Sequence, residues 1–383
     1  MIAIALLSLF GGLLLVEVLG DADTDGGGSG GSGSGGGSGS AADDLIQQAQ
    51  SIDDLMLDLG AGDDTVTTGY GNDTLLGGAG NDRIDGGSGN NSISGGAGND
   101  HLSVDNYGVN SSIVDGGTGN DTIGSRDGSD ILLGGDGNDD IKGRWGDDII
   151  NGGPGNDTLN GGEGMDRISS GTGDDSVIAG AGNDQVWTAQ GNQHVSLEGG
   201  DDYWIDGGGV SSGTSLELSA TDRDTVLAGD GNDTLLGYTG IDLLDGGDGD
   251  DLIHAIDWIY DPSYHGLDTL YGGAGNDTIE ANDGDNIYGG TGADAFHIHL
   301  DGFSYDFYTS QITIHDFDPS EDVLFVRYDG SMAENTLDLE VNESAEGTLV
   351  SLGDANSVFL PGVTADQITT ENVVWGWPAT ATV

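Results

Sequence analysis

The chain has 383 residues, and 68 acidic side chains against 7 basic ones give it a formal net charge of −61. This charge excludes nucleic acid and anionic membrane surfaces as partners, because binding to phosphates requires a basic face. There is no cysteine, which excludes disulfides, thiol nucleophiles and cysteine zinc sites. The 75 glycines and the high charge are typical of a disordered chain unless counter-ions neutralise the acids.

The chain opens with an apolar run at residues 2–16, which continues to residue 19. Its length lies near the lower limit for a membrane-spanning helix, and no basic residue precedes it. Three interpretations stay open: an uncleaved signal-anchor, a cleaved signal, and the apolar N-terminus of a soluble protein. The first is favoured, with the rest of the chain exported. Residues 1–20 are therefore predicted to be a signal-like segment, and residues 21–40 a Gly/Ser-rich linker.

A nine-residue pattern, Gly-Gly-X-Gly-Asn-Asp-X-(Leu/Ile/Val)-X, recurs about two dozen times after residue 59, with clean copies at residues 77–85 and 152–160. Glycine suits turn positions with positive φ, and asparagine at position five is expected to tolerate the left-handed region. The aliphatic residue at position eight is expected to point into a core. The period therefore predicts one turn and one short strand per repeat, and an all-β parallel solenoid with two repeats per coil.

Position six is acidic in most repeats. Carboxylates and exposed turn carbonyls are hard oxygen ligands, which Ca²⁺ binds in sets of six to eight at about 2.3–2.6 Å, whereas Mg²⁺ prefers a compact octahedron and keeps its waters. We therefore predict that multiple Ca²⁺ ions bind between stacked turns. The predicted metal ligands are Asp64, Asp73, Asp82, Asp100, Asp121, Asp130, Asp139, Asp148, Asp157, Asp166, Asp175, Asp184, Asp202, Asp224, Asp233, Asp242, Asp251, Asp268, Asp277 and Asp294.

Several repeats depart from the pattern. Three are expected to carry an amide in place of the acid: Asn91, Gln193 and Asn286. The frame shifts by three residues within residues 104–115 and by more within residues 206–218, and it is expected to be one residue short within residues 255–262. Insertions into a solenoid are expected to loop out without ending the stack.

One aliphatic residue per repeat makes a thin core. Burying it stabilises the fold by about 1.5–3 kcal/mol, whereas ordering each of nine residues costs about 1–2 kcal/mol. Folding is therefore predicted to require the metal, with disorder in the calcium-poor cytoplasm and folding outside the cell. The predicted core residues are Val66, Leu75, Ile84, Ile93, Leu102, Ile123, Ile150, Leu159, Ile168, Val177, Val186, Leu235, Leu244, Ile253 and Ile279.

Beyond residue 296 the glycine period gives way to alternation of apolar and polar residues, which is typical of strands. Strands are expected at residues 296–300, 312–315, 323–326, 348–352 and 357–360. Together with the two N-terminal segments, the predicted organisation is an N-terminal cap at residues 41–58, a repeat roll at residues 59–297 and a β-rich C-terminal cap at residues 298–383.

The repeats and three C-terminal segments, residues 292–296, 314–324 and 360–363, resemble the RTX (repeat-in-toxin) family of hemolysin-type calcium-binding proteins. The resemblance implies a right-handed parallel β-roll stabilised by Ca²⁺ and a location outside a bacterial cell or on its surface. It also implies that the C-terminal region caps the roll and serves a type I export machinery. The apolar N-terminus departs from the family's usual plan, which leaves the export route open.

The sequence contains no coherent catalytic set. It has no H-E-x-x-H motif, and its G-x-S-x-G matches at residues 27–31 and 209–213 lack a strand-turn-helix context. His297 and His299 are expected to share one strand face with Asp301, and outward polar residues are favoured there over a metal site. Aromatic residues in the turns and one insertion are expected to pack over the insertion or to stack on a partner: Tyr70, Trp145, Tyr238, Trp258, Tyr260 and Tyr264.

These features favour an exported, non-enzymatic calcium-binding protein with a structural or adhesive role. A surface polysaccharide or another protein is the expected partner, and contact with the membrane is expected only through residues 2–19. Two alternatives stay open. One is an RTX exoenzyme or toxin-like protein with an active site in an insertion or the C-terminal region, and the other is a secreted calcium buffer.

Overall fold

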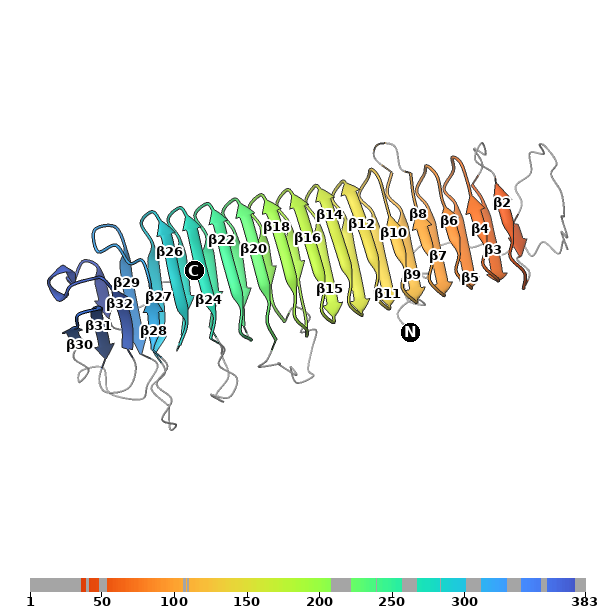
Figure 1. Cartoon of the computed structure of the whole chain (residues 1–383). Helices are drawn as coiled ribbons and strands as arrows, with labels where there is room; N and C mark the ends of the chain where they lie inside the picture. The colour runs from red at the N-terminus through yellow and green to blue at the C-terminus, as the bar shows by residue number, and fades with distance from the viewer. Residues whose placement is uncertain are drawn as a thin grey trace.

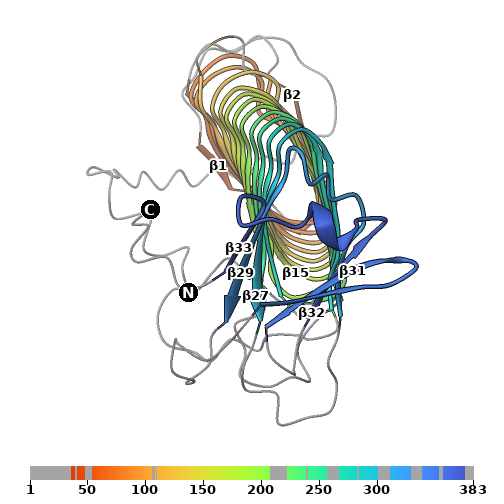
Figure 2. The same cartoon turned by 90° about the vertical axis from the view of Figure 1, so that its left-hand side faces the viewer.

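The computed structural model describes residues 36–38, 41–47, 54–105, 108, 110–207, 222–238, 240–256, 267–282, 284–300, 311–328, 339–352 and 357–375. Within these residues the chain winds into a long rod of stacked coils, seen from the side in Figure 1 and along the rod in Figure 2. Each coil of the repeat region contributes one strand to each of two sheets, and neighbouring coils pair in parallel. The predicted all-β parallel solenoid is confirmed.

The two sheets face each other across the core. Sheet A consists of β1 (Gly36–Ser38), β3 (Met56–Ala61), β5 (Thr74–Ala79), β7 (Ser92–Ala97), β9 (Ile113–Thr118), β11 (Ile131–Asp136), β13 (Ile149–Pro154), β15 (Arg167–Thr172), β17 (Gln185–Trp187), β19 (Tyr203–Ile205), β21 (Thr234–Gly237), β23 (Leu252–Ala255), β25 (Thr278–Ala281), β27 (Ala295–Leu300), β29 (Val323–Tyr328) and β33 (Val373–Trp375). Sheet B consists of β2 (Leu45–Gln47), β4 (Thr65–Thr67), β6 (Arg83–Asp85), β8 (His101–Ser103), β10 (Thr122–Gly124), β12 (Asp140–Trp145), β14 (Thr158–Glu163), β16 (Ser176–Ala181), β18 (His194–Gly199), β20 (Thr225–Asp230), β22 (Leu243–Asp248), β24 (Thr269–Ala274), β26 (Asn286–Thr291), β28 (Ile312–Ile314), β30 (Leu339–Glu343), β31 (Gly347–Leu352) and β32 (Ser357–Pro361).

The core is a narrow stack of aliphatic side chains between the sheets. Every predicted position-eight residue is buried there. Parallel register places equivalent residues side by side, as Leu75 against Ile93 in sheet A and Ile84 against Leu102 in sheet B. Because side chains alternate along a strand, the residues on either side of position eight face outward, so each repeat adds little apolar burial.

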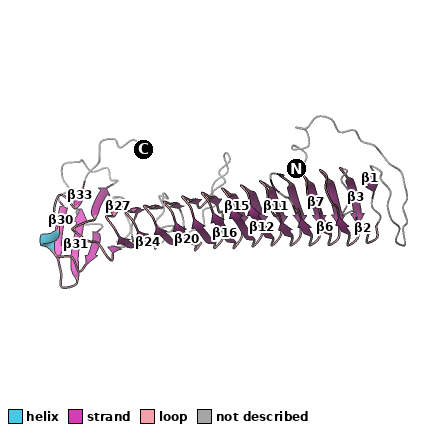
Figure 3. Ribbon diagram, turned by 90° about the horizontal axis from the view of Figure 1, so that it is seen from above, coloured by secondary structure: helices cyan, strands magenta, loops and turns pink. Residues whose placement is uncertain are grey.

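Parallel pairing extends past both ends expected for the roll. At the N-terminal end β1 pairs with β3 and β2 pairs with β4, and at the other end β27, β29 and β33 continue sheet A. The antiparallel strands β30, β31 and β32 and a short 3-10 helix (Ala365–Gln367) close the C-terminal end (Figure 3). All five expected C-terminal strands are confirmed, β30 and β33 were not predicted, and the domain boundaries stay a prediction.

Hydrogen bonds between equivalent turns fix the true repeat frame. They span 21 residues at the first insertion and 31 at the second, which confirms both frame shifts. The N–H of Asp242 donates to Asp268, 26 residues later, so the segment after Asp251 contains one insertion and is not one residue short. The N–H of Asp268 donates to Asp285 Oδ1 at 3.0 Å. The prediction that Asn286 occupies position six was therefore wrong: the repeat before it lacks one residue, and Asn286 begins β26.

Some expectations fall outside the part of the chain that the structure describes. These are the apolar segment 2–19, most of the Gly/Ser-rich linker and the G-x-S-x-G match at residues 209–213, together with Trp258, Tyr260, Tyr264 and Asp301. Among the described residues, no helix has the length and apolar character needed to cross a membrane.

Candidate metal sites in the turns

The position-six aspartates stack in two columns, one along each edge of the rod where turns connect the sheets. One carboxylate oxygen of each accepts a hydrogen bond from the backbone N–H of the position-six residue one coil earlier. In one column, Asp157 Oδ1 accepts from the N–H of Asp139 at 2.8 Å. In the other, Asp148 Oδ1 accepts from the N–H of Asp130 at 2.7 Å. The acid at position six therefore holds the coil before it in register.

The second carboxylate oxygen is buried in most of these residues and has no hydrogen-bond donor. Asp148 and Asp157 are each only 1% exposed. On folding, their Oδ2 atoms therefore lose their hydrogen bonds to water, and no protein donor replaces them. A buried charge without a partner is costly, and the cost recurs along both columns, so the arrangement fits a bound cation. Among the described residues, Oδ2 is buried without a hydrogen-bond partner in Asp64, Asp73, Asp82, Asp100, Asp121, Asp139, Asp148, Asp157, Asp166, Asp175, Asp184, Asp202, Asp233, Asp251 and Asp277.

Burial also raises the pKa of these carboxyl groups. Loss of water is the main reason that the pKa of Asp148 rises to about 8; the hydrogen bond from the N–H of Asp130 lowers it, and repulsion from Asp166 adds to the rise. The pKa values of Asp157 and Asp166 rise to about 7 for the same main reason. At neutral pH such groups stay ionised only beside positive charge, which a bound cation supplies.

Two turns that carry an amide instead of the acid show what surrounds Oδ2. The Nδ2 of Asn91 donates to the carbonyl oxygen of Gly86 at 2.9 Å. The Nε2 of Gln193 donates to the carbonyl oxygens of Gly173 at 2.9 Å and Ala189 at 3.1 Å. In the acidic turns an oxygen replaces this donor nitrogen, so carboxylate and carbonyl oxygens converge without a proton between them. Such convergent oxygens are suitable ligands for a hard cation.

The structure adds three position-six residues that the sequence did not assign: Ser112, Asp285 and Asp322. Ser112 follows the first insertion, and its hydroxyl accepts from the N–H of Asn91 at 3.1 Å. Asp322 Oδ1 accepts from the N–H of Asp294 at 3.0 Å, 28 residues earlier in the chain. The insertion before Ser112 and the absence of a nearby glycine turn before Asp322 hid these residues from a search for a nine-residue period.

All of the predicted aspartates are buried at their expected places, and each accepts the N–H bond from the previous coil. Their role as ligands stays a prediction. Within the described ranges, no group of three or more His, Asp or Glu side chains could hold a metal.

Asparagine at position five has a different role from the one expected. Among the described residues, the non-glycine residues with positive φ are Arg144 and Glu198, so asparagine does not serve the left-handed region. Instead, Asn120 Oδ1 accepts from the N–H of Asn138 at 2.9 Å, and Asn138 Oδ1 accepts from the N–H of Asn156 at 2.8 Å. These exposed bonds form a second ladder along the edge of the rod.

His297 and His299 lie on one face of β27, as expected, and alternate with the buried residues Phe296 and Ile298. Burial is the main reason that the pKa of His299 falls to about 4, and it also lowers the pKa of His297. Neither histidine belongs to a group of metal-binding side chains in the part of the chain that the structure describes.

Comparison of the sequence with models of protein families finds a match to one family. The model of the RTX calcium-binding nonapeptide repeat, which spans four copies, matches residues 58–93, 76–105, 111–139, 124–159, 160–192, 222–255 and 266–296, just over half of the chain. No curated protein sequence matches.

Two solved structures are similar to parts of the rod. A subunit of the mannuronan C5-epimerase of Azotobacter vinelandii, solved in solution, is 28% identical over 38% of this chain and 87% of its own, with a TM-score of 0.27. A hyperactive, Ca²⁺-dependent, β-helical antifreeze protein from an Antarctic bacterium is 20% identical over 73% of this chain and 86% of its own, with a TM-score of 0.26. On the repeat match, the chain belongs to the RTX calcium-binding nonapeptide-repeat family, and its cofactor is Ca²⁺ in multiple copies.

Proposed function

We propose that this protein is an exported rod that folds on binding calcium and has a non-catalytic structural or adhesive role outside a bacterial cell or on its surface. The observation that carries the proposal is the pair of columns of buried carboxylates whose second oxygen has no donor. A chain with this feature and a net charge of −61 needs calcium to become compact. Calcium is scarce in the cytoplasm and abundant outside, so the folded rod belongs outside.

The position-six aspartates are the proposed ligands. Each contributes Oδ2, and turn carbonyls contribute the remaining protein oxygens. The carbonyl oxygens that Asn91 and Gln193 hold by hydrogen bonds mark the equivalent atoms in the acidic turns. Bound calcium supplies the positive charge that the buried carboxylates lack. The turns of Asn91 and Gln193 bind no calcium in this proposal, because the amide already satisfies the carbonyl oxygens.

Replacing two neighbouring acids by amides tests the ligand assignment. In Asp157→Asn/Asp175→Asn each amide can donate to turn carbonyls, as Asn91 does, so we expect the coils to remain while fewer calcium ions bind. Calorimetric titration measures the number bound, and circular dichroism measures the fold. Asp174→Asn is the matched control: Asp174 is exposed and its Oδ1 accepts from the N–H and the Nδ2 of Asn192, and the Oδ1 of an asparagine can accept both bonds. Equal calcium binding by the double variant and the control would contradict the assignment.

Cell fractionation tests export. Cells grown with calcium are separated into cytoplasm, membrane and medium, and mass spectrometry defines the N-terminus of the protein in each. We expect the protein in the membrane or the medium. Retention of residues 2–19 in the membrane fraction would identify a tether, and their loss would identify a cleaved signal. Folded protein confined to the cytoplasm would contradict export, and turnover of ester, glycoside or peptide substrates would contradict the non-catalytic role.

A further inference from the structure

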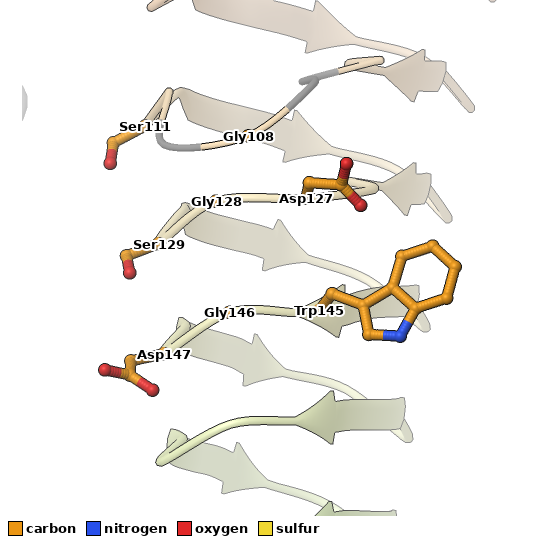
Figure 4. Close-up of a pocket in the computed structure, with 8 residues that line it drawn as sticks. All are labelled: Gly108, Ser111, Asp127, Gly128, Ser129, Trp145, Gly146 and Asp147. Atoms are coloured by element: carbon orange, nitrogen blue, oxygen red, sulfur yellow. The ribbon is translucent and has the colours of Figure 1, made fainter.

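A shallow trough lies along one edge of the rod, at the turns that lead into β11 and β13. Its floor is the backbone of Gly128 and Gly146, where an added Cβ on Gly146 would overlap the carbonyl oxygen of Gly128. Asp127 and Trp145 stand on one side of this floor (Figure 4). Since neither glycine carries a side chain, the floor stays open beside the exposed ring of Trp145.

The position-five ladder is interrupted along the opposite side of the trough, where Ser111, Ser129 and Asp147 stand (Figure 4). In most coils the N–H of the position-five residue donates to a side-chain oxygen on the coil before, as the N–H of Asn138 does to Asn120. Among the described residues, the N–H groups of Ser129 and Asp147 have no such acceptor, because position five of the coil before carries a serine, Ser111 or Ser129, in place of the longer Asn or Asp. Two donors and two hydroxyls are therefore available to a ligand.

The other side of the trough carries an exposed aromatic ring beside a strained residue. Trp145 is 46% exposed, although burying an indole is strongly favourable. Arg144, which precedes it, has a φ of 74°, whereas its partner in the next coil is Gly162 with a φ of 116°. The left-handed region is unfavourable for a residue with a side chain. The backbone strain at Arg144 lies beside the exposed ring of Trp145, and strain of this kind clusters at ligand-binding sites. This favours a role of the pair in binding a ligand over a role in stabilising the fold.

We propose that this trough binds a neutral glycan. The indole of Trp145 offers a flat apolar surface to the C–H face of a sugar ring. The N–H and hydroxyl groups of Ser129 can donate to sugar oxygens, and the carboxylates of Asp127 and Asp147 can accept from sugar hydroxyls. A ligand with many hydroxyls matches donors and acceptors together, whereas the two carboxylates repel an anionic glycan. The inference rests on the calcium-folded roll and gives the proposed surface role a class of ligand.

Affinity electrophoresis of the calcium-loaded full chain tests this site. The gels contain dextran, soluble starch, xylan, galactomannan or a β-1,3-glucan, with polygalacturonate as the anionic contrast. We expect retardation by at least one neutral polysaccharide. Trp145→Ala should weaken it about tenfold, the scale of removing an aromatic stacking surface, and Trp145→Phe should retain most of it. Tyr70→Ala is the matched control, because Tyr70 is a 59% exposed ring at the same repeat position. The ladder is intact beside it, where the N–H of Asn90 donates to Asn72 Oδ1.

A second variant separates binding from folding. Ser129→Asn supplies the missing acceptor for the N–H of Asp147, so we expect a higher melting temperature but weaker glycan binding. A purely structural role of the trough predicts no such opposite changes.

Three results would overturn the inference: no retardation in any neutral gel, retardation by polygalacturonate alone, or equal effects of Trp145→Ala and Tyr70→Ala. Circular dichroism with calcium accompanies each variant. Normal calcium-dependent folding without glycan binding would remove this inference and leave the proposed function intact.

Discussion

The glycine that opens a repeat lies against the buried carboxylate five residues later. An added Cβ on Gly152 would overlap Asp157 Oδ2 and lie 2.5 Å from the carbonyl oxygen of Ser170 in the next coil. The same overlap with the position-six carboxylate recurs at Gly134 and Gly161. At the residue scale, glycine at position one of these repeats leaves room for the carboxylate oxygen proposed to bind calcium, whereas other repeats carry a larger residue there, such as Ser170 or Ala179.

Substitution of this glycine gives a direct test. We expect Gly152→Ala to lower the free energy of unfolding of the calcium-loaded protein by about 1–3 kcal/mol, the usual cost of forcing a methyl group into filled space. The control is Gly124→Ala, because a Cβ on Gly124 meets nothing within 4 Å and its φ is not positive. Denaturant unfolding at fixed calcium measures both, and equal losses would show that the carboxylate does not fix position one.

At the scale of the repeat, the sequence predicts an element well when it keeps the nine-residue spacing. Val66 and Leu75 are buried as expected, because a turn at a constant interval leaves one inward position per strand. Asp285 was missed because coils are held in register by bonds between them, and these bonds survive the loss of a residue from one repeat. Spacing along the chain therefore predicts the regular coils and fails where a coil changes length.

The hydrogen bonds of the turn residues along the edge of the rod were harder to predict than the strands. Asparagine at position five fits both a left-handed turn and a ladder of side-chain bonds, and only the stacking of Asn120 on Asn138 shows that the ladder is correct. The sequence alone shows Trp145 as an unusual turn residue. The open donors of Ser129 could not be predicted, because their availability depends on the residue 18 positions earlier, Ser111, and on how the two turns stack.

At the scale of the whole molecule, the negative charge lies in two environments. Many acids are exposed, but the position-six carboxylates are buried in columns. Salt screens exposed charges, with a Debye length of about 3 Å at 1 M, but it supplies no ligand to a buried oxygen. Calcium and sodium should therefore affect the rod differently.

We expect the calcium-free chain to be expanded and to lack the strand signal in circular dichroism. Millimolar Ca²⁺ should restore the strands and a rod-shaped scattering profile. NaCl at 1 M should contract the chain slightly without restoring either, because screening does not replace direct ligands. Circular dichroism and small-angle X-ray scattering measure the two effects, and an equal response to NaCl would show that repulsion alone keeps the chain unfolded.

The insertions in the second half of the rod begin at regularly spaced coils. Segments outside the described residues follow β19, β23 and β27, and the chain returns as β20, β24 and β28. In sheet A these strands alternate with β21 and β25, so the departures occur at every second coil, roughly 10 Å apart. The ladder continues across the first of them, where Asp224 Oδ1 accepts from the N–H of Gln193 at 2.9 Å. The roll therefore sets the spacing of anything attached after β19, β23 or β27. A peptide grafted after one of these strands would begin at a fixed distance from peptides grafted after the other two, with the register of the coils unchanged.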